Sequence, residues 1–116
     1  MPPSESCDPP PVSILVSLLS GPWTLYILWG LGSRKSMRFG ALSREIQGIS
    51  TKVLTERLRM LEAEGIIYRE YQATIPPQVT YGLTDRGQEL MGVIEQIDVL
   101  AQRWYGQKNS SQVSQK

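Results

Sequence analysis

The sequence contains no histidine and a single cysteine, Cys7, among its 116 residues. One cysteine cannot form a disulfide within the chain, and without histidine one chain cannot assemble a zinc site of the Cys/His type. The sequence also has no evident base to activate Cys7 and no glycine-rich phosphate loop following a strand. We therefore expect no metal, no cofactor and no enzymatic activity.

Long apolar runs are also missing, since no segment reaches the roughly 18 apolar residues that a membrane-spanning helix requires. The first residues, MPPSESCDPPP, lack the basic stretch and apolar run of a secretory signal. These absences predict a cytoplasmic protein. The length favours one domain at residues 12–106, between a proline-rich arm at 1–11 and a polar tail at 107–116. Both flanking segments are poor in core-forming residues, so we expect them to be disordered.

Positive charge is scarce overall, because the net charge is only +1, but it is concentrated in one segment. Residues 34–59 hold seven bases and two acids, a balance of +5. The segments before and after it, residues 1–33 and 60–116, each carry −2. A basic segment between acidic flanks is typical of nucleic-acid binding, although an ordinary solvated face would give the same pattern.

Hydrophobic spacing and capping signals predict five helices and two strands. The helices are expected at 12–19, 23–31, 39–46, 51–64 and from 85 onward, and the strands at 66–72 and 78–83. Residues 32–37 read as a polar, basic turn. Two short helices joined by a glycine-containing turn and followed by a β-hairpin describe a mainly α winged helix-turn-helix.

The helix at 23–31 is apolar on nearly every side, which predicts a buried central helix. It contains three aromatic residues, Trp23, Tyr26 and Trp29. Aromatic residues in such a helix favour an ordinary place in the core. The alternative is that these rings line a ligand pocket near a dimer interface.

The stretch ISTKVLTERLRMLEAEG predicts the helix that would read DNA. Leu54, Leu58 and Leu61 form its apolar stripe, and the opposite face is polar. In a helix-turn-helix, such a face enters the major groove. The residues that this geometry places at the DNA surface are Thr51, Lys52, Thr55 and Arg59 on the helix, Arg34, Lys35 and Arg38 before the motif, and Arg69 on the first strand. The wing tip, Ala73–Val79, contains no base.

Four motifs carry a resemblance to the HxlR family of bacterial regulators over about residues 7–105. They are GPWTLYIL, MRFGALSREIQGIS, KVLTERLRMLEAEGII and PPQVTYGLTDRGQEL, in the family's order and spacing. The resemblance implies that the partner is double-stranded DNA with a pseudo-palindromic operator. It also implies that Ser50 lies at the DNA surface. Pro22 and Gln78 depart from the family pattern, since each stands where a base is usual.

The resemblance also implies a homodimer that forms through the first and last helices. The apolar residues that we assign to this interface are Val12, Leu15, Leu19, Ile94, Ile97, Leu100, Ala101 and Trp104.

Many members of the family resemble redox or electrophile sensors that use a cysteine just before the first helix, where Cys7 stands. A thiolate is the reactive form, and the neighbouring Glu5 and Asp8 disfavour it. An exposed cysteine without a role is the alternative. For the whole chain, the alternative function is a winged-helix module that binds protein and not DNA.

Overall fold

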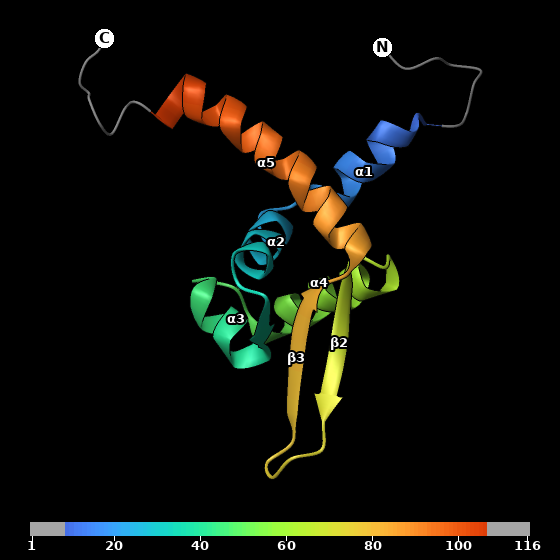
Figure 1. Ribbon diagram of the computed structural model, residues 1–116, viewed down its shortest axis with the longest axis vertical. Helices are drawn as coiled ribbons and strands as arrows, with labels where there is room; N and C mark the ends of the chain where they lie inside the picture. Colours follow the sequence, from blue (N-terminus) through green and yellow to red (C-terminus); the bar gives the residue numbers. More distant parts are fainter. Residues whose placement is uncertain (1–8, 107–116) are drawn as a thin grey trace.

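The structure is a computed structural model that describes residues 9–106. The elements follow in the order α1 (Pro11–Leu19), α2 (Thr24–Ser33), β1 (Ser36–Arg38), α3 (Phe39–Glu45), α4 (Thr51–Ala63), β2 (Ile67–Gln72), β3 (Gln78–Leu83) and α5 (Asp85–Tyr105). Helices α2, α3 and α4 form the body (Figure 1). The β2–β3 hairpin, called the wing below, projects from one end of the body, and α1 and α5 project from the other (Figure 1).

Local signals place the boundaries of α4 where the sequence predicts them. The Ser50 hydroxyl accepts a hydrogen bond from the Val53 backbone N–H at 3.1 Å, which satisfies one of the free donors of the first turn. Gly65, just past the end of the helix, has a φ of +77°, a conformation that side chains with a Cβ rarely adopt. The predicted helix at this place is confirmed.

The predicted turn at residues 32–37 is wrong except at Arg34 and Lys35, because α2 continues to Ser33 and Ser36–Arg38 forms β1. This strand pairs antiparallel with β3, with Met37 opposite Tyr81, and the sheet order is β1-β3-β2. Three residues carry little strand signal by themselves. Pairing with a distant strand and burial of Met37, which is 4% exposed, stabilise them in extended form.

The core lies between α2, α3, α4, the base of the sheet and the first half of α5. Leu54, Leu58 and Leu61 are each at most 2% exposed, so the predicted stripe of α4 is confirmed. The remaining core residues are Ile27, Leu28, Leu31, Met37, Leu42, Ile46, Ile66, Ile67, Leu83, Leu90, Met91 and Ile94.

The prediction that α2 is buried all round is wrong. Leu25, Tyr26 and Trp29 are 43%, 59% and 39% exposed, while Ile27 and Leu28 on the other side are fully buried. The elements that pack on α2 cover one side of it and leave the aromatic side open to solvent. Periodicity cannot reveal this, because an apolar residue looks the same whether or not another element covers it.

Helix α5 begins with a side-chain cap and then leaves the body. The Thr84 hydroxyl accepts from the Gly87 N–H at 3.1 Å and donates to the Gly65 carbonyl at 2.6 Å, which ties the helix start to the end of α4. Gly87 packs so closely on the Ile66 carbonyl that a Cβ there would collide with it. Past Ile94 the helix contributes no buried residue.

Among residues 9–106, no single helix is both long and apolar enough to cross a membrane. Helices α1 and α2 reach the required length and composition only as a pair, and they are bent by 84° at the break between them.

Candidate nucleic-acid interface

The polar face of α4 lies opposite the buried leucines and is open to solvent. Thr51 and Lys52, in the first turn, are exposed, as is Arg59 two turns later. Thr55, between them, is half-buried. Ser50 is exposed and holds the N-terminus through its cap, where free backbone N–H groups and the helix dipole favour an anion. The first turn of α4 therefore presents two hydroxyls, one ammonium and N–H donors on one surface.

A polar hollow of about 260 Å³ separates α4 from the sheet. Thr55, Arg59 and Glu62 line it from α4, and Arg69 and Tyr81 line it from the strands. Arg69 Nε lies 3.7 Å from a Glu62 carboxylate oxygen, and both side chains are close to half exposed. Arg69 therefore points toward α4, although Glu62 partly neutralises it.

Sequence reasoning did not select Tyr81 as a site residue. The strand register could have indicated it, because Tyr81 pairs with Arg69 on one side and Met37 on the other, and paired residues share a face of the sheet. Burial raises the pKa of the Tyr81 hydroxyl above its usual 10.0; Arg69 lowers this pKa, Glu62 raises it and Arg59 lowers it. The hydroxyl therefore remains protonated near neutral pH and can donate a hydrogen bond into the hollow.

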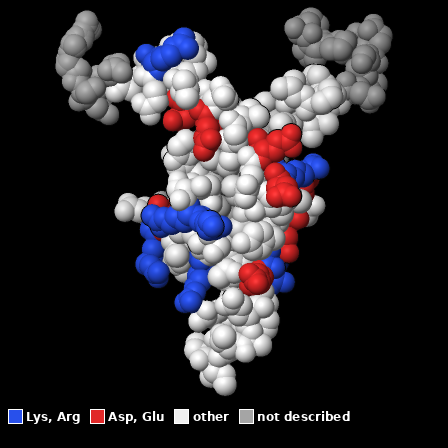
Figure 2. Space-filling view, in the orientation of Figure 1, with Lys and Arg blue, Asp and Glu red and all other residues white. Residues whose placement is uncertain are grey.

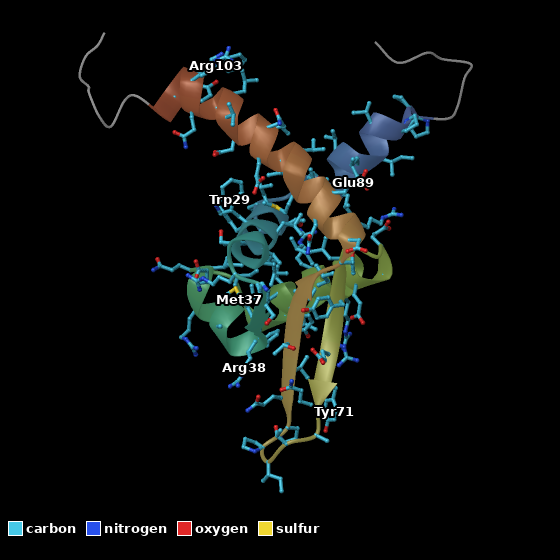
Figure 3. All side chains as sticks on the ribbon, viewed as in Figure 1. Trp29, Met37, Arg38, Tyr71, Glu89 and Arg103 are labelled. Atoms are coloured by element: carbon cyan, nitrogen blue, oxygen red, sulfur yellow. The ribbon has the colours of Figure 1, made fainter. Side chains whose placement is uncertain are left out.

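The three predicted bases before the motif do not gather at one place. Arg34 forms an ion pair with Glu45 at 2.9 Å. Lys35 lines a different hollow, beside Glu95 of α5 and Tyr68 of β2. Arg38 is exposed at the start of α3, on the side toward which the wing projects (Figure 3). Of the three, Arg38 is the base that lies on the same side of the molecule as the wing.

Arg57, counted in the basic segment, faces away from the polar side of α4. Its Nη2 would lie 3.1 Å from a Cβ placed on Gly21, and it lines a groove under α1 with Met60 and Arg86. One base of the +5 segment thus packs near the start of α2 and does not add to the polar face of α4.

The wing has an uncharged tip, which Figure 2 shows as white surface below the charged body. Ala73–Val79 contains no acid or base. Ile75 is fully exposed at the tip, and Tyr71 on β2 is 60% exposed. The hydroxyl of Thr74 donates to the Pro76 carbonyl at 2.7 Å across the tip. Contacts from this tip would be apolar, or would use backbone groups and the neutral polar side chains of Thr74 and Gln78.

The terminal helices carry most of the exposed large apolar residues among residues 9–106, and α1 has no buried residue. Of the residues predicted for a dimer interface, Val12, Leu15, Ile97, Leu100 and Trp104 are 36% to 64% exposed, and Leu19 and Ala101 are partly buried. Ile94 is an exception to the prediction, because it is 4% exposed and belongs to the core. Ile14, Val16, Val93 and Tyr105, which the sequence prediction omitted, are exposed on the same two helices.

Two helices joined by a short turn, with an antiparallel hairpin after the second, are the arrangement of winged helix-turn-helix DNA-binding proteins. The chain belongs to the HxlR family: the HxlR-like helix-turn-helix model matches residues 18–109. Members of this class are transcriptional regulators and not enzymes.

Relatives in two bacteria support this assignment. YdzF, an uncharacterised HTH-type transcriptional regulator of Bacillus subtilis, is 37% identical over 87 residues, which span 75% of this chain and 80% of YdzF. An uncharacterised HTH-type transcriptional regulator of Synechocystis sp. is 39% identical over 99 residues, 85% of this chain and 73% of that protein.

Two solved structures of redox-related proteins are similar. The reduced form of the regulator YodB from B. subtilis has a TM-score of 0.75 at 31% identity, covering 84% of this chain and 95% of YodB. The redox regulator HypR in its oxidised form has a TM-score of 0.73 at 30% identity, covering 80% of this chain and 95% of HypR. Cys7 lies outside the residues that the structure describes.

Proposed function

We propose that the chain is a sequence-specific DNA-binding transcriptional regulator whose α4 enters the major groove. The major groove is wide enough for a helix and displays a distinct donor and acceptor pattern for each base pair. Thr51, Lys52 and Thr55 supply hydroxyl and ammonium groups at the end of α4 that would approach the base edges. The observation that carries the proposal is this exposed polar face opposite a fully buried leucine stripe.

Phosphate contacts come from the bases around α4. Arg38 and Arg59 are exposed, and Arg69 lines the hollow beside Arg59. Ser50 lies at the helix N-terminus, where backbone N–H groups favour a phosphate. Arg34 and Lys35 contribute at longer range, since one is paired with Glu45 and the other faces α5. Counterion release makes this part of the binding strongly salt-dependent.

The regulator acts as a homodimer that forms through α1 and the second half of α5. Monomeric proteins rarely expose large apolar patches, and both helices carry several exposed apolar side chains. The exposed residues of α5 that support the proposal, Val93, Ile97, Leu100 and Trp104, recur at three- and four-residue spacing along the helix. A twofold axis through this interface would place two α4 helices on a pseudo-palindromic operator.

A gel-shift titration with the DNA upstream of the chain's own gene tests the proposal. Lys52→Ala and Thr55→Ala should each weaken specific binding by about tenfold, in the range of lost base contacts, with the circular dichroism spectrum unchanged. Arg103→Ala is the matched control for Lys52→Ala, because it also removes one exposed charge but lies at the far end of α5 (Figure 3). Full affinity in both α4 variants would show that another surface reads DNA. No retardation at low salt would support a protein-interaction module.

We further propose that oxidation or alkylation of Cys7 regulates DNA binding. The similar fold of HypR, whose name describes it as a redox regulator, and the place of Cys7 just before α1 support this role. Diamide treatment followed by the gel shift should change the affinity of the wild-type chain and not that of Cys7→Ser. The same response in Cys7→Ser would remove the proposal, because Cys7 is the only thiol.

A further inference from the structure

The exposed aromatic side of α2 lines a hollow that contains none of the residues proposed above to contact DNA. Trp23, Tyr26 and Trp29 form one wall of this aromatic hollow, which has a volume of about 430 Å³. The Trp23 and Tyr26 rings are 6.4 Å apart between centroids and inclined by 56°. Tyr26 is 59% and Trp29 is 39% exposed, and Figure 3 shows Trp29 projecting from α2 away from the wing. Three aromatic rings therefore border a space large enough for a small molecule.

The opposite wall carries a carboxylate. Glu45, Ile46 and Gln47, at the end of α3, complete the lining. Glu45 is the only acid or base among the lining residues. Its partner Arg34, at 2.9 Å, does not line the hollow, and the side chains of this pair are 39% and 55% exposed. An ion pair this open to water is weak, so another cation can compete for the Glu45 carboxylate.

We propose that the aromatic hollow binds a small organic cation with an apolar body, such as an arylalkylammonium ion. Trp and Tyr rings attract a cation that lies within about 6 Å of their centroids. Glu45 supplies the opposite charge and repels an anionic ligand. A neutral ligand of the same shape gains neither interaction. Charge complementarity therefore separates this ligand class from neutral and anionic aromatic compounds.

The hollow adjoins the turn of the helix-turn-helix. A ligand site at this place is a function separate from the DNA contacts proposed above. Ile46 and Gln47 lead from α3 toward α4. The Trp23 ring lies close to this turn, 3.6 Å from where a Cβ on Gly48 would be. A cation at Glu45 would also displace Arg34 from its ion pair. The bound cation therefore contacts the segment that positions α4.

Tryptophan fluorescence can measure this binding directly. The chain has three tryptophans, and Trp104→Phe leaves only Trp23 and Trp29, both in the hollow. This variant is titrated with benzyltrimethylammonium, benzyl alcohol and phenylacetate, which share a benzyl group and differ in charge. The cation should bind about tenfold more tightly than either of the others. Equal affinities, or no quenching by the cation, would overturn the proposal.

Four further substitutions in the Trp104→Phe background test the site. Glu45→Gln should weaken binding of the cation about tenfold, and Arg34→Ala should strengthen it by freeing Glu45. Glu89→Gln, which removes an exposed acid of α5 outside the hollow, should change nothing. Unchanged binding in Glu45→Gln would overturn the proposal. A Trp29→Leu variant tests whether a second copy of the chain covers the hollow instead. The proposal would also be overturned if this substitution dissociated a dimer and left cation binding intact. These titrations contain no DNA, so their failure is distinct from failure of the gel shift.

Discussion

Glu62 is a single residue that reduces the positive charge of the surface beside α4. It lines the polar hollow between two bases, Arg59 and Arg69, and pairs with the second at 3.7 Å. A carboxylate in this position opposes the approach of a phosphate, and it also holds Arg69 in place. Because both partners are close to half exposed, the pair contributes little to folding stability.

Glu62→Gln is expected to increase DNA affinity several-fold at low salt, because it removes one negative charge from the hollow and frees Arg69. The thermal midpoint should stay nearly unchanged. Gel shifts at two salt concentrations measure the effect, and Glu89→Gln, an equal charge change on α5, is the control. Equal gains in both variants would mean that only net charge matters.

Substitutions of Ser50 measure how much the hydrogen bond at the N-terminus of α4 contributes to the stability of the protein. Ser50→Ala removes the acceptor of the Val53 N–H bond and should lower the free energy of unfolding by about 1 kcal/mol. Ser50→Asn keeps an acceptor and should lose much less. Urea denaturation of the three proteins measures the difference. Similar loss in both variants would assign the effect to something other than the cap.

The tip of the wing has a composition that does not suit phosphate binding. The tip is uncharged, Ile75 is fully exposed, and Gln78 follows the two prolines. The wing tip therefore adds little electrostatic attraction, and the bases around α4, including Arg69 on β2, provide most of it. An added charge at the tip should reveal whether the tip lies near the duplex.

Ile75→Lys is expected to tighten DNA binding and to steepen its salt dependence by about one counterion, because each phosphate contact adds roughly 0.9 to the slope. Ile75→Gln, which is polar and neutral, should not change the slope. Affinity measured from about 50 to 200 mM salt gives the slopes. Identical slopes for both variants would place the tip away from the phosphates.

At the scale of the whole molecule, residues 9–106 leave most of α1 and the second half of α5 uncovered. The second half of α5 leaves the body, and α1 buries none of its residues (Figure 1). A small domain buries a smaller share of its surface than a large one. Covering these apolar faces in a dimer would therefore add stability, and it would also position two α4 helices for DNA binding.

Ile97→Glu is expected to convert the dimer into a monomer and to weaken operator binding at least about tenfold, because a charge would be buried at the interface. Sedimentation velocity measures the oligomeric state. Ile75→Glu makes the same chemical change at the wing tip and should leave the dimer intact. A dimer that persists in Ile97→Glu would place the interface elsewhere.

Local signals in the sequence determined the ends of α4 and the start of α5. Ser50, Gly65 and Thr84 act through hydrogen bonds or backbone conformation close by in the chain, and the leucine stripe of α4 follows from helix periodicity alone. These features need no knowledge of the rest of the fold. The polar face of α4 could therefore be predicted residue by residue.

Only the tertiary structure determined which surfaces are covered and which residues meet. It placed Ser36–Arg38 against β3, brought Tyr81 and Arg69 into one hollow with Glu62, and left the aromatic side of α2 open. Each of these outcomes depends on contacts between residues far apart in the chain. Hydropathy records how strongly a side chain favours burial, but the neighbours that bury it are set by how the elements pack.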